Sequence, residues 1–253
     1  MGKDQHSDYQ WIGVGVYTIT EAARLTAVSV GRVRRWMKGY TFRRHGEARV
    51  SPPVVHGHYA AAEVGQTALS FADLIEVRCV HAFLEAGVSW KTLRAAHARA
   101  VKLLGVDHPF ATQKFFTDGH TILTRFDEQG ILDIVGNQLA FNRILDRYLK
   151  GVLDFVDQVP VRWWPMGRRR AVVIDATRSF GQPIIHTEGV PTAVLYRAYR
   201  AESGERGSFP SIGEGASPNV VPDPYAISRV ANWFGVEKRS VRTAIEYELR
   251  LAA

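Results

Sequence analysis

The chain has 253 residues, of which 46% are apolar and 23% are charged, with a formal net charge of +7 and a pI of about 9.7. This length exceeds that of one small helical bundle and suits two or three small domains. The single cysteine, Cys79, excludes a disulfide framework or a cysteine-based zinc site within one chain. No apolar stretch reaches the roughly 18 residues of a membrane span, and no leader pattern opens the chain, which predicts a cytoplasmic protein.

Signals for helix ends are clear in the first part of the chain. Residues 1–16 are polar and then glycine-rich, and we expect them to form a flexible N-terminus. Thr20 precedes a run of strong helix formers and is expected to cap a first helix, while Ser29 is expected to cap a second. Gly39 is a typical stop for that second helix. The pattern therefore predicts two short helices joined by a turn.

A wing and a helical hairpin are predicted next. Residues 40–53 contain two strand-like runs around a turn, which is the position of a wing after a helix pair. Ser70 and Ser89 are expected to cap two longer helices, the second of which ends at Leu104. Their apolar residues recur at helical spacing, so we expect these two helices to pack against each other.

The remaining chain is expected to hold a connecting region and a second small domain. A β hairpin around Asp118-Gly119 and a helix over 139–155 are predicted in the connecting region. Residues 171–174 form an apolar strand, and two helices are predicted over 224–251. The expected domains are the flexible N-terminus (1–16), a winged helix-turn-helix (17–104), a connecting and dimerisation region (105–160), a linker (161–170) and a C-terminal helical domain (171–253).

Positive charge is concentrated in the predicted helix pair and wing. Between residues 18 and 60 there are eight Lys or Arg and two acidic residues, so this sixth of the chain carries +6 of the net +7. A recognition helix contacts base edges with its N-terminal half, while flanking cations hold phosphates. Arg32 is therefore expected to contact bases, and Arg43 and Arg44 to hold phosphates. The candidate DNA-binding residues are Ser29, Arg32, Arg34, Arg35, Lys38, Arg43 and Arg44. The alternative is an ordinary helical hairpin with a basic face.

The expected fold class is mainly α: a winged helix-turn-helix, a helical middle region and a small C-terminal three-helix domain, with minor β hairpins. One short recognition helix makes too few base contacts for a specific DNA site. We therefore expect a homodimer whose two recognition helices are spaced about one DNA turn apart. The helices over 70–104 and 139–155 are the expected dimerisation elements.

Two aromatic pairs and one arginine run are candidates for contact with a protein partner. Trp233 and Phe234 are adjacent, so at helical spacing they cannot both enter one narrow core: either one of them is an exposed anchor or both belong to the core at a broad apolar face. Trp163-Trp164 carries the same ambiguity. Residues 168–170 are either a solvated linker or a cationic segment that enters an acidic cleft. The candidate partner-binding residues are Trp163, Trp164, Arg168, Arg169, Arg170, Trp233 and Phe234.

No catalytic constellation, cofactor motif or metal site is predicted, which indicates that the chain is not an enzyme. His45, His56 and His58 lie near one another, but no further ligand follows at a close spacing. Asp73 and Glu76 are three residues apart on a predicted helix, and such an acidic pair is expected to face solvent.

The N-terminal part resembles the MerR-like winged helix-turn-helix. The resemblance rests on the run from Tyr17 to Leu25, on Val28-Ser29 and on the run from Val33 to Trp36. The segments 69–76 and 85–89 look like the helices that follow the wing in that superfamily. The resemblance covers about residues 16–104 and implies operator DNA as a partner.

A second resemblance lies in the C-terminal part, which looks like the small domain of VapB-type antitoxins. It rests on the segments 172–175, 179–183 and 189–192, although the loop over 201–224 is longer than the usual turn. The family implies an antitoxin of a type II toxin-antitoxin system, which neutralises a PIN-type ribonuclease toxin and represses its own operon. The alternative is a stand-alone, ligand-responsive MerR-like regulator with an effector pocket in residues 105–250.

Overall fold

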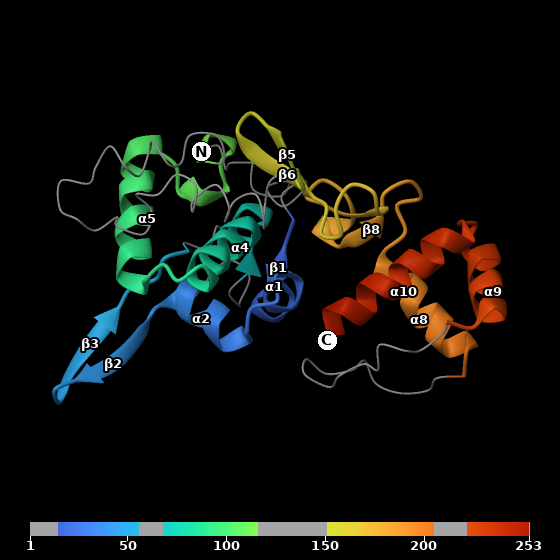
Figure 1. Ribbon diagram of the computed structural model, residues 1–253, viewed down its shortest axis with the longest axis horizontal. Coiled ribbons are helices and arrows are strands. Elements are labelled where there is room, and N and C mark those ends of the chain that lie inside the picture. The colour runs from blue at the N-terminus through green and yellow to red at the C-terminus, as the bar shows by residue number, and fades with distance from the viewer. Residues whose placement is uncertain (1–14, 56–67, 116–150, 205–221, 253) are drawn as a thin grey trace, which may run out of the picture. The chain divides into compact units, whose positions relative to one another are not determined.

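The computed structural model describes residues 15–55, 68–115, 151–204 and 222–252 (Figure 1). The chain divides into an N-terminal unit, which comprises residues 16–161, and a C-terminal unit, which begins at residue 162. The Asp118-Gly119 turn and most of the helix predicted over 139–155 lie outside the described residues. No helix in the described ranges combines the length and apolar character that a bilayer span requires.

Two short helices open the N-terminal unit: α1 (Ile19–Thr26) and α2 (Val30–Lys38). The Thr18 hydroxyl accepts a 3.1 Å hydrogen bond from the Glu21 N–H, and the Glu21 carboxylate accepts one of 2.8 Å from the Thr18 N–H. This capping box places the N-cap at Thr18, so the prediction of Thr20 was wrong by two residues. Ser29 caps α2 as predicted.

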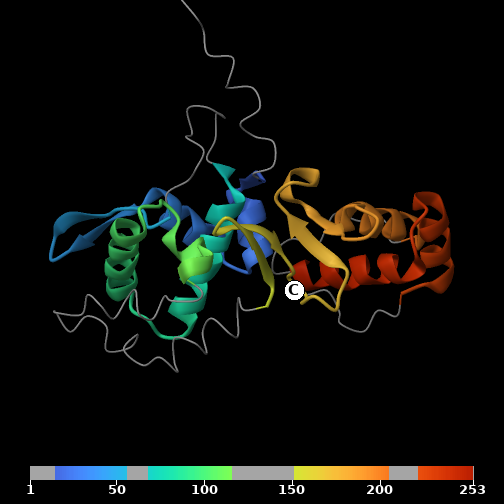
Figure 2. The same cartoon turned by 90° about the horizontal axis from the view of Figure 1, so that it is seen from above.

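An antiparallel hairpin of β2 (Tyr40–Arg44) and β3 (Glu47–Ser51) follows α2, in the place predicted for a wing. Both views show it as a two-stranded arm that extends beyond the helices (Figures 1 and 2). Gly39 ends α2 with φ +70, and an added Cβ there would lie 2.4 Å from the Ser51 carbonyl oxygen. Only glycine therefore allows this close return of β3 to the base of the hairpin.

Two longer helices, α4 (Phe71–Glu85) and α5 (Trp90–Leu104), begin at the predicted caps Ser70 and Ser89. A two-residue strand pair that was not predicted, β1 (Tyr17–Thr18) with β4 (Ala68–Leu69), ties the start of α1 to the start of α4. The short 3-10 helix η1 (Pro109–Ala111) packs against α4. The side chain of Phe110, in the region predicted as connecting, is completely buried within the N-terminal unit.

A buried carboxylate holds this second helical layer together. Glu76 on α4 accepts hydrogen bonds from His97 Nε2 at 3.1 Å, His108 Nδ1 at 3.0 Å and the Phe110 N–H at 3.2 Å. Asp73 and Glu76 are both completely buried, so the prediction that they face solvent was wrong. Burial raises the pKa of Glu76, but the hydrogen bonds from His108 and His97 outweigh burial and hold that pKa below its ordinary value.

The C-terminal unit begins within a four-stranded sheet of order β5-β6-β7-β8. Its strands are β5 (Leu153–Val156), β6 (Val159–Trp163), β7 (Val172–Asp175) and β8 (Pro183–Ile185). The pairs β6–β7 and β7–β8 are antiparallel, with Trp163 opposite Ile174. The helix predicted over 139–155 was wrong at its end, because residues 153–155 belong to β5. The first three residues of the linker predicted over 161–170 belong to β6, and the C-terminal unit begins at residue 162, within that predicted linker. Tertiary pairing with β7 orders a segment whose composition suggested a boundary.

Three helices complete the C-terminal unit: α8 (Thr192–Glu202), α9 (Pro224–Phe234) and α10 (Lys238–Ala252). They pack against one another in both views (Figures 1 and 2). Their shared core includes Leu195, Ile227 and Val241, each at most 1% exposed. The buried Glu248 carboxylate accepts a 2.5 Å hydrogen bond from the Thr192 hydroxyl, which joins α10 to α8.

Candidate nucleic-acid interface

The α2 helix is sharply two-sided. Val33, Trp36 and Met37 are buried against the unit, whereas Arg34, Arg35 and Lys38 are exposed on the other side. This arrangement follows from the sequence, because apolar residues at helical spacing enter the core and leave the intervening cations in water. The exposed face of α2 therefore presents several positive charges from one short helix.

These cations are not neutralised within the described part of the chain. No carboxylate of the described residues lies within ion-pair distance of Arg34, Arg35, Lys38 or Arg43. Arg35 bonds only to a neutral group, the Gly31 carbonyl oxygen at 3.3 Å. Arg32 differs, since it lies 3.7 Å from the Glu85 carboxylate and both side chains are about half exposed. Such a surface pair is weak, so an incoming phosphate can displace it.

The wing carries the other predicted cations. Arg43 is exposed on β2, and Arg44 is the last residue of that strand, although its side chain lies outside the described part. Arg49 on β3 lies 3.4 Å from the Glu47 carboxylate. Ser29 is exposed at the start of α2, where its hydroxyl accepts a hydrogen bond from the Arg32 N–H. The structure thus gathers Ser29, the α2 cations and Arg43 in the helix pair and its wing.

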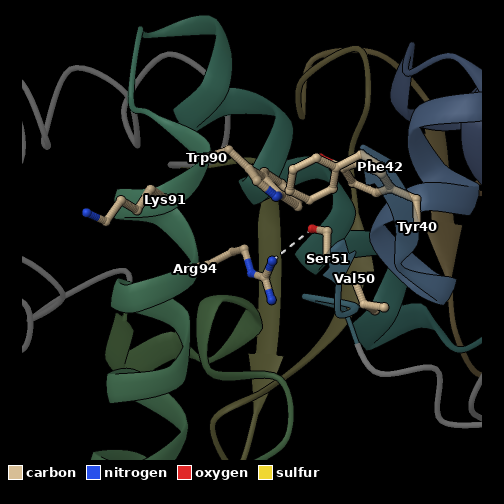
Figure 3. A pocket seen from close by; sticks show the side chains of 7 residues that line it. All are labelled: Tyr40, Phe42, Val50, Ser51, Trp90, Lys91 and Arg94. Carbon is tan, nitrogen blue, oxygen red and sulfur yellow. Dashed lines mark hydrogen bonds between the residues drawn. The ribbon is translucent and has the colours of Figure 1, made fainter. Parts of the chain in front are cut away.

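A groove lies between the base of the wing and the first turns of α5, and we call it the wing-base groove. It has a volume of about 320 Å³ and is lined by Tyr40, Phe42, Val50, Ser51, Trp90, Lys91 and Arg94. Figure 3 shows Phe42 and Trp90 among the side chains that line the groove and the Arg94 guanidinium turned toward Ser51. Arg94 Nη1 donates a 2.8 Å hydrogen bond to the Ser51 hydroxyl.

Sequence reasoning missed the wing-base groove. Ser51 and Arg94 are 43 residues apart, and no local pattern indicates that they meet. The available signal was the cap at Ser89, which places Lys91 and Arg94 three residues apart in the first turns of a helix. That spacing puts them on neighbouring positions of the helix surface, but it does not show which element faces them.

The predicted partner-binding residues separate into buried and exposed ones. Trp163 is 1% exposed and Trp164 is 9% exposed, so of the two alternatives left open for this pair the core holds: Trp163 ends β6 and Trp164 follows it directly. Trp233 is 60% exposed and Phe234 38%, at the end of α9. Tyr225 at the start of the same helix, which was not predicted, is 81% exposed.

The arginine run over 168–170 is only partly available for a partner. All three side chains are exposed. Arg170 donates a 2.9 Å hydrogen bond to the Glu246 carboxylate, and the Arg168 guanidinium lies 5.7 Å from the centre of the Trp164 ring. Two of the three therefore have contacts within the C-terminal unit. Of the three histidines considered for a metal, His56 and His58 lie outside the described residues.

Comparison with known proteins agrees with the location of the cationic surface. Residues 15–97 match the family described as "Putative DNA-binding HTH domain". Over 90% of its length the chain is 27% identical to the "Putative antitoxin VapB45" of Mycobacterium tuberculosis (strain ATCC 25618 / H37Rv), and the match covers 95% of that protein. The crystal structure of Rv2018 from Mycobacterium tuberculosis has a similar fold, with a TM-score of 0.61 and 22% identity over 92% of this chain and 98% of that one. The chain therefore contains a helix-turn-helix domain of a family described as DNA-binding.

Proposed function

We propose that the chain is a cytoplasmic antitoxin of a type II toxin-antitoxin system and is not an enzyme. In this proposal the N-terminal unit binds operator DNA and represses the chain's own operon. The C-terminal unit binds and neutralises a PIN-type ribonuclease toxin. The chain acts as a homodimer, because two recognition helices are needed to contact enough base pairs of a palindromic operator.

The observation that carries the DNA-binding part is the uncompensated charge on α2 and the wing. Arg34, Arg35, Lys38 and Arg43 are exposed and have no carboxylate partner among the described residues. A folded surface that holds several like charges without internal partners is complementary to a polyanion. The match of residues 15–97 to a DNA-binding helix-turn-helix family supports the same partner.

The toxin-binding part is supported by the relative named as an antitoxin and by the exposed aromatic residues of α9. Trp233 and Phe234 are exposed although large aromatic side chains are normally buried. Exposed aromatic residues of this kind are the commonest anchors of protein interfaces. We propose that Trp233 and Phe234 contact the toxin. Arg169, which lies five residues after the buried Trp164, is a further candidate for this contact.

DNA binding is tested with duplexes from the region upstream of the chain's own gene. The full chain is titrated into these duplexes at a series of salt concentrations, with a scrambled duplex as the control. We expect tighter binding to an upstream duplex than to the scrambled one, and a linear fall of log K with log salt. Equal, weak binding to both duplexes at low salt would contradict the repressor function.

Toxin binding is tested by co-expression of the full chain with the product of the neighbouring gene. We expect a stable complex that suppresses the ribonuclease activity of that product. Trp233→Ala is expected to weaken the complex, while Tyr247→Phe, a change inside the C-terminal core, serves as the control. A free chain and an active neighbouring ribonuclease would contradict the antitoxin function and favour a stand-alone regulator.

A further inference from the structure

The guanidinium of Arg94 is partly buried, yet its charge has no counter-ion among the described residues. The Ser51 hydroxyl, at 2.8 Å, is its hydrogen-bond partner, and a hydroxyl is neutral. Removing a charge from water is costly unless an opposite charge compensates it. Because Ser51 occupies one N–H group of a planar fork with five, Arg94 remains able to bind an anion bidentately.

The surroundings of Arg94 hold this guanidinium in a fixed place. Trp90, one turn before it on α5, stacks on Trp36 of α2 with ring centroids 6.1 Å apart. Tyr40 and Phe42, whose rings are 5.8 Å apart, form the facing wall on the wing (Figure 3). Arg94 is thus positioned by α2, α5 and the wing together, and its anchor Ser51 is buried.

The charge of the wing-base groove has one sign. Its lining includes two charged side chains, Lys91 and Arg94, and no carboxylate. Lys91 is exposed at the rim, where its ammonium points away from the rings in Figure 3. The groove therefore combines one oriented cation, one flexible cation and aromatic walls, which is complementary to an anion attached to a less polar group.

The groove is continuous with the surface of α2. The Arg35 guanidinium on α2 lies 5.9 Å from the centre of the Tyr40 ring, which lines the groove. A DNA strand that contacts Arg35 therefore meets Tyr40 and the groove behind it. In a DNA strand each phosphate is joined to deoxyribose, and the sugar supplies the less polar face that the aromatic walls require.

We propose that the wing-base groove binds the sugar-phosphate backbone of the operator, with Arg94 as the residue that contacts the phosphate. This inference rests on the proposed DNA-binding function and extends the DNA interface from α2 and the wing to α5. Phe42 and Tyr40 pack against the deoxyribose, and Lys91 adds a second, weaker phosphate contact. The groove positions the duplex and contributes no base discrimination.

The test measures DNA affinity of the full-length chain as a function of salt for Arg94→Gln, Arg94→Lys and Lys102→Ala. Arg94→Gln keeps a donor for Ser51 but removes the charge. We expect it to lower the salt slope by about 0.9 per recognition helix and the affinity about eightfold at 0.1 M salt, on upstream and scrambled duplexes alike. Arg94→Lys keeps the charge and should keep most of the slope. Lys102→Ala, at the far end of α5, should match the unmodified chain.

Three outcomes overturn the proposal while leaving the DNA-binding function intact. An unchanged slope for Arg94→Gln shows that Arg94 merely positions the wing, even if affinity falls. A loss confined to the upstream duplex assigns Arg94 to base contacts instead. Normal DNA binding with lost binding of the neighbouring gene's product assigns the groove to a protein. Failure of the unmodified chain to bind any duplex contradicts the proposed function itself, and thermal unfolding of each variant confirms that it is folded.

Discussion

The two units use the same residue type in different ways. On α2 and the wing, Arg34, Arg35 and Arg43 have no carboxylate partner among the described residues. In the C-terminal unit four exposed arginines do have such a partner at short range. Their pairs are Arg170–Glu246 at 2.9 Å, Arg229–Glu202 at 2.8 Å, Arg239–Glu237 at 2.6 Å and Arg250–Glu246 at 2.8 Å.

This difference shows why net charge alone is a weak guide to a binding surface. The charge of a paired arginine is compensated by its carboxylate partner, whereas the charge of an unpaired arginine remains available to bind an external anion. The exposed chemistry of the C-terminal unit is instead aromatic, with Tyr225 81% and Trp233 60% exposed on α9. This difference is the basis on which we propose phosphate contact for the N-terminal unit and protein contact for the C-terminal unit.

The largest expected effect is on the free energy of unfolding, and it differs between a buried and an exposed tryptophan of the C-terminal unit. Trp163→Ala is expected to lower the free energy of unfolding by about 3 to 5 kcal/mol, because the ring is 1% exposed and leaves a cavity. Trp233→Ala should change it by about 0.5 kcal/mol or less, because the ring is 60% exposed. Urea unfolding of both variants measures the difference. Equal losses would show that Trp233 also belongs to a core, and would remove it from the partner surface.

The next largest expected effect is on DNA affinity, and it tests the difference between unpaired and paired cations with two variants that each lose two positive charges. For each recognition helix of the dimer, Arg34→Ala with Lys38→Ala is expected to lower the slope of log K against log salt by about 1.8 and the affinity about 60-fold at 0.1 M salt. Arg239→Ala with Arg250→Ala removes two positive charges that have carboxylate partners, and should leave both quantities nearly unchanged. Fluorescence anisotropy with an upstream duplex provides the measurement. Similar losses in both variants would mean that total charge governs binding.

Local signals in the sequence were enough to place most helices. Caps depend on residues within one turn, so Ser29, Ser70 and Ser89 were identified correctly. The start of α1 was missed because Thr18 and Thr20 both have the right side chain, and the reciprocal bond from Glu21 decides between them. The boundary predicted from Pro160 and the tryptophans lies where the C-terminal unit begins, but the first three residues of the predicted linker belong to β6, which pairs with β7.

Only those parts of the candidate interface that depend on residues close together in the sequence could be predicted. The exposure of Arg34, Arg35 and Lys38 follows from helical spacing, but the absence of a carboxylate partner for them among the described residues had to be observed in the fold. Arg94 was not predicted, because its role depends on Ser51, which lies 43 residues earlier. The buried state of Glu76 was likewise missed, since His97 and His108 lie 21 and 32 residues away from it. Nothing near Glu76 in the sequence shows that these imidazoles surround it.

The smallest expected effect concerns pH and belongs to the N-terminal unit. Burial lowers the pKa of His108, but its hydrogen bond to Glu76 and the charge of Asp73 outweigh burial, so the pKa lies above the ordinary 6.5. The stabilisation from this pair is therefore complete below pH 6.5 and is lost as the pH rises through the raised pKa of His108. The lowered pKa of Glu76 sets the lower limit of the pH range in which the pair is stabilising, because the stabilisation from the Glu76 carboxylate is lost only as the pH falls below the ordinary pKa of 4.5.

His108→Gln isolates this contribution. At pH 6 the variant should be less stable by about 1.5 to 3 kcal/mol, because a buried carboxylate loses a charged hydrogen-bond partner. The gap between the two proteins should narrow as the pH is raised toward 9, since the unmodified protein loses the charge on His108 and the variant has none to lose. His81 acts in the opposite direction, because burial lowers its pKa and its protonation below pH 6.5 is destabilising. Since both proteins retain His81, its effect cancels in the gap measured by urea unfolding. A gap that stays constant from pH 6 to pH 9 would show that His108 is neutral in the folded protein.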